Sequence, residues 1–277
     1  MKILVPVDLY DSSHSAYEYA VHFANLIDAE LTLLHVINSV FTGFEVIAYD
    51  PYIEMEKAAK KRLSDYVSKY KSKDGKKLPQ VNTKIEVMFG IPGFAINEYA
   101  NSNDMDLIIM GVRDKHGLFD RMLGSASNET INDAKCPIIL IHTSTVFKKP
   151  EKILFAFDRK TDLDDSLEDF KEFNNIIKAK TDFLHINVKK TDDISEQKAE
   201  IVSELFEKDD PQFAFEVKTL SGNNVITGLN DYCFFEKVDL VTMIHREGGL
   251  FSNFFRTDKS IKIAQKLHLP VIVFQED

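Results

Sequence analysis

The sequence predicts an α/β fold built from two tandem domains, each with a doubly wound parallel sheet. Short apolar segments alternate with longer amphipathic ones along all 277 residues. This alternation is typical of parallel strands joined by right-handed helical crossovers. Several apolar segments of the first half also recur, in the same order, in the second half. One of them, at residues 106–110, runs into a loop that is marked by glycines.

The first half contains five predicted strands and four predicted helices. The run from Leu107 to Met110 is apolar without interruption, as expected for a strand that is covered on both faces. Asp11, Ser12 and Ser13 are candidate N-caps for the first helix, and Pro92 suits the first turn of the third helix. We expect strands near 2–7, 30–37, 83–89, 106–111 and 137–142, and helices near 12–28, 52–73, 92–103 and 125–134.

The second half repeats the first. Asp8 and His35 end two apolar segments, and Asp158 and His185 end the matching segments 150 residues later. Similar-looking buried strands do not by themselves explain equal spacing of polar residues, so the repeat indicates a duplication. We expect domains at 1–146 and 151–277, and second-half strands near 152–157, 181–188, 213–219, 239–245 and 270–275. The linker at 143–151 is expected to expose its Lys148–Pro150 tip.

Composition excludes several classes of function. The net charge of -10 provides no basic surface for nucleic acid or for an anionic membrane. No stretch approaches the roughly 20 apolar residues of a membrane span, and the first residues are apolar too briefly for a secretory signal. Two cysteines cannot form a disulfide framework, so we expect a cytoplasmic protein. No motif with metal-ligand spacing is present.

The segment from Asp106 to Ser127 is the most informative one. Gly111 lets the backbone turn at the end of a strand, and Gly124-Ser125 precedes a pattern with helical spacing. The start of a helix offers free N–H groups and a positive dipole end, which favour an anion such as phosphate. An ordinary strand-loop-helix connection fits the local string equally well. Asp8 ends the first strand, so it would face the same crevice if the first and fourth strands are neighbours.

These residues resemble the universal stress protein family, and its tandem members in particular. The resemblance rests on Ile3-Leu-Val-Pro-Val-Asp8, on Leu33-Leu-His-Val36, and on Gly111 and Gly124-Ser125 before Cys136-Pro137. It implies Rossmann-like domains of strand order 3-2-1-4-5 that pair through their fifth strands, and binding of ATP or AMP, with Mg²⁺. The implied nucleotide-binding residues are Val7, Asp8, Val36 and Met110 around the adenosine, and Gly111, Gly124, Ser125 and Ala126 around the phosphates.

One position departs from the family pattern, which has Gly, two residues, Gly, nine residues, Gly, then Ser or Thr. Asp114 occupies the second glycine. A carboxylate roughly 6 Å from a phosphate charge, at an effective dielectric near 20, repels it by about 2–3 kcal/mol before screening by salt. Arg113 or Lys115 would offset this repulsion if either points inward. We therefore expect Asp114 to weaken nucleotide binding.

The second half lacks the glycine loop. After Met243 no Gly-Ser follows at the required distance, and Arg256 or Thr257 stands where the phosphate glycine is expected. Phenylalanines at 251, 254 and 255 give the segment an apolar character, suited to filling the vacant groove or to an interface. We interpret residues 151–277 as a degenerate domain.

The sequence favours a cytoplasmic stress-response protein whose first domain binds adenine nucleotide and whose second domain is its built-in partner. The alternative is a protein-interaction scaffold of the same fold that binds no nucleotide. A slow ATPase has less support, because Asp8 is a candidate base but no second group is placed beside it by any spacing. We therefore assign no catalytic residues and no metal site. We expect pairing of the domains within the chain, and a homodimer remains open.

Overall fold

A computed structural model describes residues 1–9, 11–38, 51–70, 72, 75, 77–112, 125–157, 164–187, 194–222, 224–245 and 269–275. Strands β1–β5 and their helices form what we call the first half, and β6–β10 with their helices form the second half. The first half comprises β1 (Lys2–Pro6), α1 (Asp11–Ile27), β2 (Glu30–Ile37), α2 (Pro51–Lys69), β3 (Thr83–Phe89), α3 (Pro92–Ser102), β4 (Leu107–Val112), α4 (Ser125–Asp133) and β5 (Ile138–His142).

The second half has the same alternation of strands and helices. It comprises β6 (Lys152–Phe157), α5 (Asp164–Ile177), β7 (Lys180–Asn187), α6 (Ser195–Phe206), β8 (Phe215–Ser221), α7 (Val225–Glu236), β9 (Leu240–His245) and β10 (Val271–Gln275). Every strand lies within two residues of its expected bounds. Helix α2 ends at Lys69, four residues before its expected end. None of the helices in these described ranges is long and apolar enough to cross a membrane.

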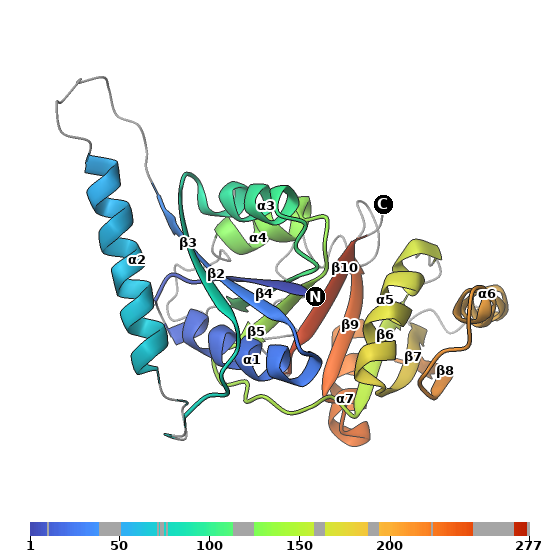
Figure 1. The fold of residues 1–277 in the computed structure, drawn as a ribbon. Helices are drawn as coiled ribbons and strands as arrows, with labels where there is room; N and C mark the ends of the chain where they lie inside the picture. Colours follow the sequence, from blue (N-terminus) through green and yellow to red (C-terminus); the bar gives the residue numbers. More distant parts are fainter. Residues whose placement is uncertain are drawn as a thin grey trace.

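The ten strands of the described residues form one sheet, in the order β3-β2-β1-β4-β5-β10-β9-β6-β7-β8 (Figure 1). Each half therefore has the strand order 3-2-1-4-5 and is parallel throughout. The halves meet where β5 pairs antiparallel with β10, with Leu140 opposite Val271 and Ile138 opposite Val273. The expected pairing through the fifth strands is confirmed. It covers two apolar edges that would otherwise be open to aggregation.

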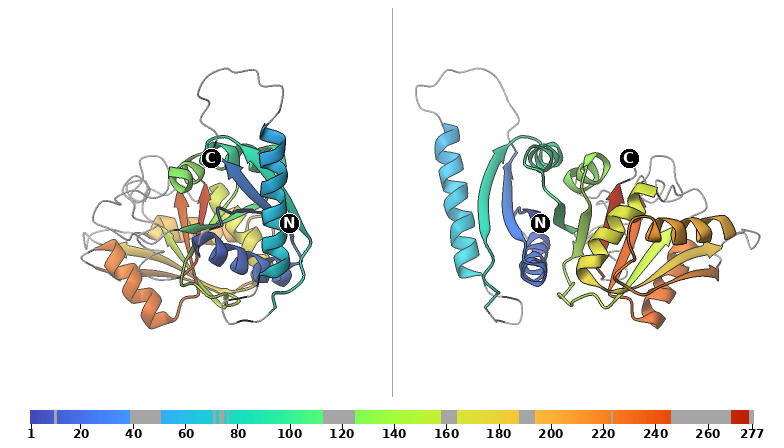
Figure 2. Two further views of the ribbon diagram at one scale, coloured as in Figure 1. Left: turned by 90° about the vertical axis from the view of Figure 1, so that its left-hand side faces the viewer. Right: turned by 45° about the vertical axis from the view of Figure 1, so that its right-hand side comes forward.

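Two apolar cores cover the two faces of this sheet, and each core continues across both halves. Side chains of α1, α2, α5 and α6 pack on one face, which we call the α1 face. Side chains of α3, α4 and α7 pack on the other, the α4 face. The turned views show α2 lying beside β3 at one end of the molecule, with α6 near the opposite end (Figure 2). Strands buried on both faces explain the continuous apolar runs in the sequence.

Backbone details repeat between the halves as well. Helices α1 and α5 are each followed by a residue of left-handed conformation, Asp28 with φ of 54° and Lys178 with φ of 61°, 150 residues apart. The bond from Glu30 N to Met1 O has a counterpart from Lys180 N to Glu151 O, both 3.0 Å long. Equivalent residues therefore occupy equivalent places, which allows each half to serve as a reference for the other.

The linker tip matches its expected exposure at two of three residues. Lys148 and Lys149 are exposed, but Pro150 is buried, and the Lys148 ammonium lies 2.7 Å from the Asp239 carboxylate. The tip is therefore docked on the second half rather than projecting from it. The Pro150 ring is removed from water there, while both lysine side chains remain exposed.

Candidate functional site

The candidate site lies at the carboxyl ends of β1 and β4. These strands are neighbours, with Ile3 opposite Leu107. The chain leaves β1 for α1 on one face of the sheet, and it leaves β4 toward α4 on the other face. Connections that diverge in this way leave a crevice at the sheet edge, and ligands of open α/β sheets bind at such switch points. The condition set by the sequence, that the first and fourth strands are neighbours, is therefore met.

Asp8 stands at this edge with an exposed side chain. The residue before it is tied to β2, because Val7 N donates to the Leu34 carbonyl at 2.8 Å. The residue after it, Leu9, has φ of 64°, so the chain turns sharply there in the left-handed region. Asp8 thus lies in a short connection between β1 and α1.

The expected adenosine residues divide between the two faces of the sheet. Val36 and Met110 pack with the core of the α4 face, where Met110 is buried and Val36 is partly buried. Val7 belongs to the core of the α1 face. The structure thus places Val36 and Met110 on the same face of the sheet, whereas the Val7 side chain lies on the other face. Any contact of Val7 with a ligand at this edge would involve its backbone.

The expected phosphate residues lie only partly within the described structure. Gly111 is half-buried in β4, opposite Ile141. Helix α4 begins at Ser125, as expected, and continues through Ala126, whose carbonyl accepts a hydrogen bond of 2.8 Å from the Thr130 hydroxyl. Gly124 and Asp114, together with the neighbouring Arg113 and Lys115, lie outside the described residues.

The position of α4 is fixed by α3 through contacts that the sequence did not reveal. Asn97 Nδ2 donates to the Glu129 carbonyl at 3.1 Å. Gly93 faces the same turn of α4 so closely that a Cβ on it would lie 2.4 Å from Glu129 Cβ. No periodicity distinguishes this glycine from others in a helix. Its role appears only when two helices approach closely enough to need a missing side chain.

At the matching edge of the second half, larger side chains replace smaller ones. Phe157 stands where the first half has Val7, and Ile186 stands where it has Val36. The Ile186 side chain extends over Gly228, where a Cβ would lie 2.9 Å from its terminal methyl. Phe157 and Ile186 are both buried. The expected degenerate loop, with phenylalanines 251, 254 and 255, lies outside the described residues.

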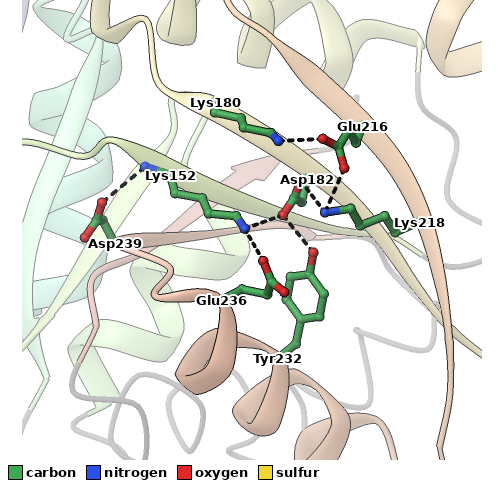
Figure 3. Close-up of polar contacts among 8 residues, drawn as sticks. All are labelled: Lys152, Lys180, Asp182, Glu216, Lys218, Tyr232, Glu236 and Asp239. Carbon is green, nitrogen blue, oxygen red and sulfur yellow. Dashed lines mark hydrogen bonds and ion pairs between the residues drawn. The ribbon is translucent and has the colours of Figure 1, made fainter.

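A second cluster of charged side chains lies at the opposite, amino-terminal edge of the second half (Figure 3). Asp182 is fully buried and accepts hydrogen bonds from Lys152, Lys218 and Tyr232 at 2.7–2.9 Å. Burial would raise the pKa of this carboxyl, but the three donors together hold it below its usual value. The lysines also reach Glu236 and Glu216, so the positive charge is matched within the cluster.

This balanced cluster is better explained as an anchor than as a binding site. It joins β6, β7, β8 and α7 through one carboxylate. A ligand there would have to displace partners that already satisfy Asp182. Within the described ranges, no group of three or more His, Cys, Asp or Glu residues is placed to hold a metal ion.

Comparison with known proteins identifies the family. The sequence profile of the universal stress protein family matches residues 1–142. Universal stress protein MJ0531 of Methanocaldococcus jannaschii is 32% identical over 153 residues, which cover 54% of this chain and 84% of that protein. Universal stress protein YxiE of Bacillus subtilis is 31% identical over 146 residues, covering 50% of this chain and 97% of that protein.

Among solved structures, a universal stress protein from Archaeoglobus fulgidus matches the whole fold. Its TM-score is 0.72 at 21% identity, and the match covers 99% of this chain and 96% of that one. The family match spans half of the chain, and its range includes β1 to β5. The chain therefore belongs to the universal stress protein family.

Proposed function

We propose that the first half, residues 1–146, binds an adenine nucleotide, ATP or AMP, at the carboxyl ends of β1 and β4. The observation that carries this proposal is the placement of the exposed Asp8 carboxylate at the same switch point from which β4 leads to the start of α4. A carboxylate accepts hydrogen bonds from ribose hydroxyls, and a helix start favours phosphate. Val36 and Met110 supply an apolar wall next to them.

The proposed phosphate contacts are those of Gly111, Gly124, Ser125 and Ala126. Backbone N–H groups at the start of α4 and the Ser125 hydroxyl would donate to phosphate oxygens. A Mg²⁺ ion would accompany ATP and be held mainly by its phosphates, because this chain shows no protein-built metal motif. Asp114 would oppose the phosphates and lower the affinity.

We propose further that residues 151–277 form a degenerate partner domain. Phe157 and Ile186 support this assignment, because they put larger side chains where the first half has Val7 and Val36. The β5–β10 pairing supports a role as a built-in partner. In this proposal the protein acts in the cytoplasm during stress, and nucleotide occupancy of the first domain is the signal or the store.

The test is calorimetric titration of the purified protein with ATP and AMP, with and without Mg²⁺, together with mass spectrometry of any ligand released on denaturation. We expect one site per chain. Asp8→Ala should weaken binding, and Gly124→Val should abolish it, because a branched side chain blocks approach of the phosphates. Phe157→Val, made at the matching edge of the second half, is the control and should not create a second site. A wild-type protein that binds neither nucleotide at millimolar concentration would refute the proposal.

One observation favours the alternative of a protein-interaction scaffold. Phe234 and Phe235, at the end of α7, are 78% and 76% exposed. Their rings lie side by side, with centroids 5.5 Å apart. The segments that begin at Asp106 and Asp239 match at an offset of 133 residues, so the first half has Asn101 and Ser102 at the equivalent positions of α3. The fold therefore does not need aromatic residues there. Replacing both phenylalanines with serine should leave nucleotide binding intact under the main proposal.

A further inference from the structure

Two consecutive residues of β2 form hydrogen bonds with the backbone of Val7, one with its N–H and one with its carbonyl. Its N–H donates to the Leu34 carbonyl at 2.8 Å, in the manner of a continuing ladder. Its carbonyl accepts a hydrogen bond of 2.8 Å from His35 Nδ1. The second bond comes from a side chain, so it lies outside the regular pattern of the sheet. Through this bond, β2 also fixes the backbone one residue beyond Pro6, where β1 ends.

The chain after this point is constrained from the other direction. Leu9 has φ of 64°, a conformation that costs a branched-chain residue roughly 1 kcal/mol, and its side chain packs against the core of the α1 face. Asp8 is therefore the one residue between a clamped peptide and a packed left-handed turn. These two neighbours set the backbone position from which its exposed side chain starts.

We propose that His35 is a positioning residue for the nucleotide: it fixes the Val7 carbonyl and thereby aims the Asp8 carboxylate at the ribose hydroxyls. This inference rests on the proposed nucleotide site and adds a residue to it. Hydrogen bonds weaken steeply with misalignment, so a small rotation of the Val7–Asp8 peptide would cost the ribose contact. His35 itself need not touch the ligand.

The second half provides a comparison within the same chain. His185 Nδ1 approaches the Phe157 carbonyl over the same separation of 28 residues, but at 3.4 Å. There the Phe157 ring also lies against the imidazole, with centroids 5.8 Å apart. The contact is thus short in the half where we place the nucleotide and long in the half where we do not. His185 is accordingly the matched control for His35.

The experiment compares three variants for binding of ATP and of 2′,3′-dideoxy-ATP, which lacks the ribose hydroxyls. We expect wild-type protein to prefer ATP by about tenfold, as for hydrogen bonds to a charged group. His35→Leu should lose most of that preference by weakening ATP binding, with little change for the dideoxy nucleotide. His35→Asn places an amide N–H close to the former Nδ1 and should restore it. His185→Leu should behave as wild type.

A purely structural role for His35 would weaken both nucleotides equally, and that result would overturn the inference. An unchanged preference in His35→Leu would also overturn it, while leaving the proposed function standing. Failure of the wild type to bind any adenine nucleotide would refute the proposed function and this inference together. Hydrogen exchange at the Asp8 amide provides a check without ligand: it should be faster in His35→Leu and unchanged in His185→Leu.

Discussion

Phe23 and Phe173 lie 150 residues apart and stack on each other, with ring centroids 6.1 Å apart and planes 15° from parallel. They occupy equivalent positions of α1 and α5, because the sequence repeat has the same offset. A residue that meets its own counterpart marks the pseudo-twofold axis between the two halves. The stack lies on the α1 face of the sheet, beside the β5–β10 seam, so the halves are joined by side chains as well as by backbone.

Removing this stack should destabilise the whole chain. Phe23 is fully buried and Phe173 nearly so. Phe23→Ala should lower the free energy of unfolding by about 3–5 kcal/mol, as for other buried phenylalanines. Urea denaturation measures this loss. Phe234→Ala, at an exposed phenylalanine, is the control and should change stability by less than about 0.5 kcal/mol.

The double variant separates the ring contact from simple burial. If the rings interact, Phe23→Ala and Phe173→Ala together should cost less than the sum of the single changes, by about 0.5–1.5 kcal/mol. Strictly additive losses would mean that the two rings fill separate parts of the core. That outcome would contradict their role as a joint contact of the two halves.

Much of this fold could be predicted from sequence because strands buried on both faces leave a simple signal. The run Leu107–Met110 and its counterpart at 240–244 needed no tertiary information. The repeat of Asp8 and His35 at 150 residues predicted two similar halves. The end of α2 was misplaced because the first glycine that could mark a boundary, Gly75, lies six residues beyond Lys69.

The site was less predictable, since its decisive features are contacts between distant segments. The motif correctly placed Ser125 at the start of α4. It could not show that Val7 faces the opposite side of the sheet from Val36, because a one-residue step reverses the direction of a side chain. Nor could it reveal the approach of Gly93 to Glu129, which depends on how α3 and α4 pack.

Asp182 should dominate the stability of the second half. Asp182→Ala leaves Lys152 and Lys218 without their shared partner in a mostly buried place, and we expect a loss of about 3–5 kcal/mol. The first half carries Thr32 at the equivalent strand position, so Asp182→Thr tests whether a neutral side chain suits the site. Urea denaturation at neutral pH distinguishes these variants. An effect below 1 kcal/mol for Asp182→Ala would contradict the anchor role.

The same carboxylate predicts a pH dependence. Because the pKa of Asp182 is lower in the folded chain than in the unfolded chain, its contribution is present above the unfolded value, near pH 4, and is lost as pH falls through the folded value. The stability difference between wild type and Asp182→Asn should therefore be constant from about pH 5 to 8 and shrink below about pH 4. A difference that stays constant down to pH 2 would contradict this reading.

Gly93→Ala should separate α3 from α4. The new Cβ would lie 2.4 Å from Glu129 Cβ, and neither atom can rotate away. We expect a loss of about 1–3 kcal/mol and weaker ATP binding, because α4 begins the proposed phosphate site. Glu129→Ala keeps its own Cβ and should not rescue the variant, whereas Glu129→Gly should do so in part. Rescue by Glu129→Ala would show that the longer side-chain atoms cause the clash.

Gly228→Ala tests whether the small residue on α7 makes room for the larger residue on β7. The first half combines Ala95 with Val36, and the second half combines Gly228 with Ile186. Gly228→Ala alone should be destabilising, because its Cβ would meet the Ile186 terminal methyl at 2.9 Å. Adding Ile186→Val recreates the pair of the first half and should recover most of the loss in thermal unfolding. Equal stability of Gly228→Ala with and without the second change would contradict this pairing.

Asp114 should weaken ATP binding, because it occupies a glycine position of the family's phosphate loop. If its charge opposes the phosphates, Asp114→Asn should raise the affinity for ATP by up to about tenfold at low salt, and Asp114→Gly by at least as much. The gain should shrink at 0.15 M salt, where the Debye length is about 8 Å. Calorimetric titration at two salt concentrations measures both effects. A gain in Asp114→Gly that is absent from Asp114→Asn would assign the effect to backbone freedom instead of charge. If neither variant binds more tightly at either salt concentration, Asp114 points away from the phosphates and the electrostatic argument for this position is wrong.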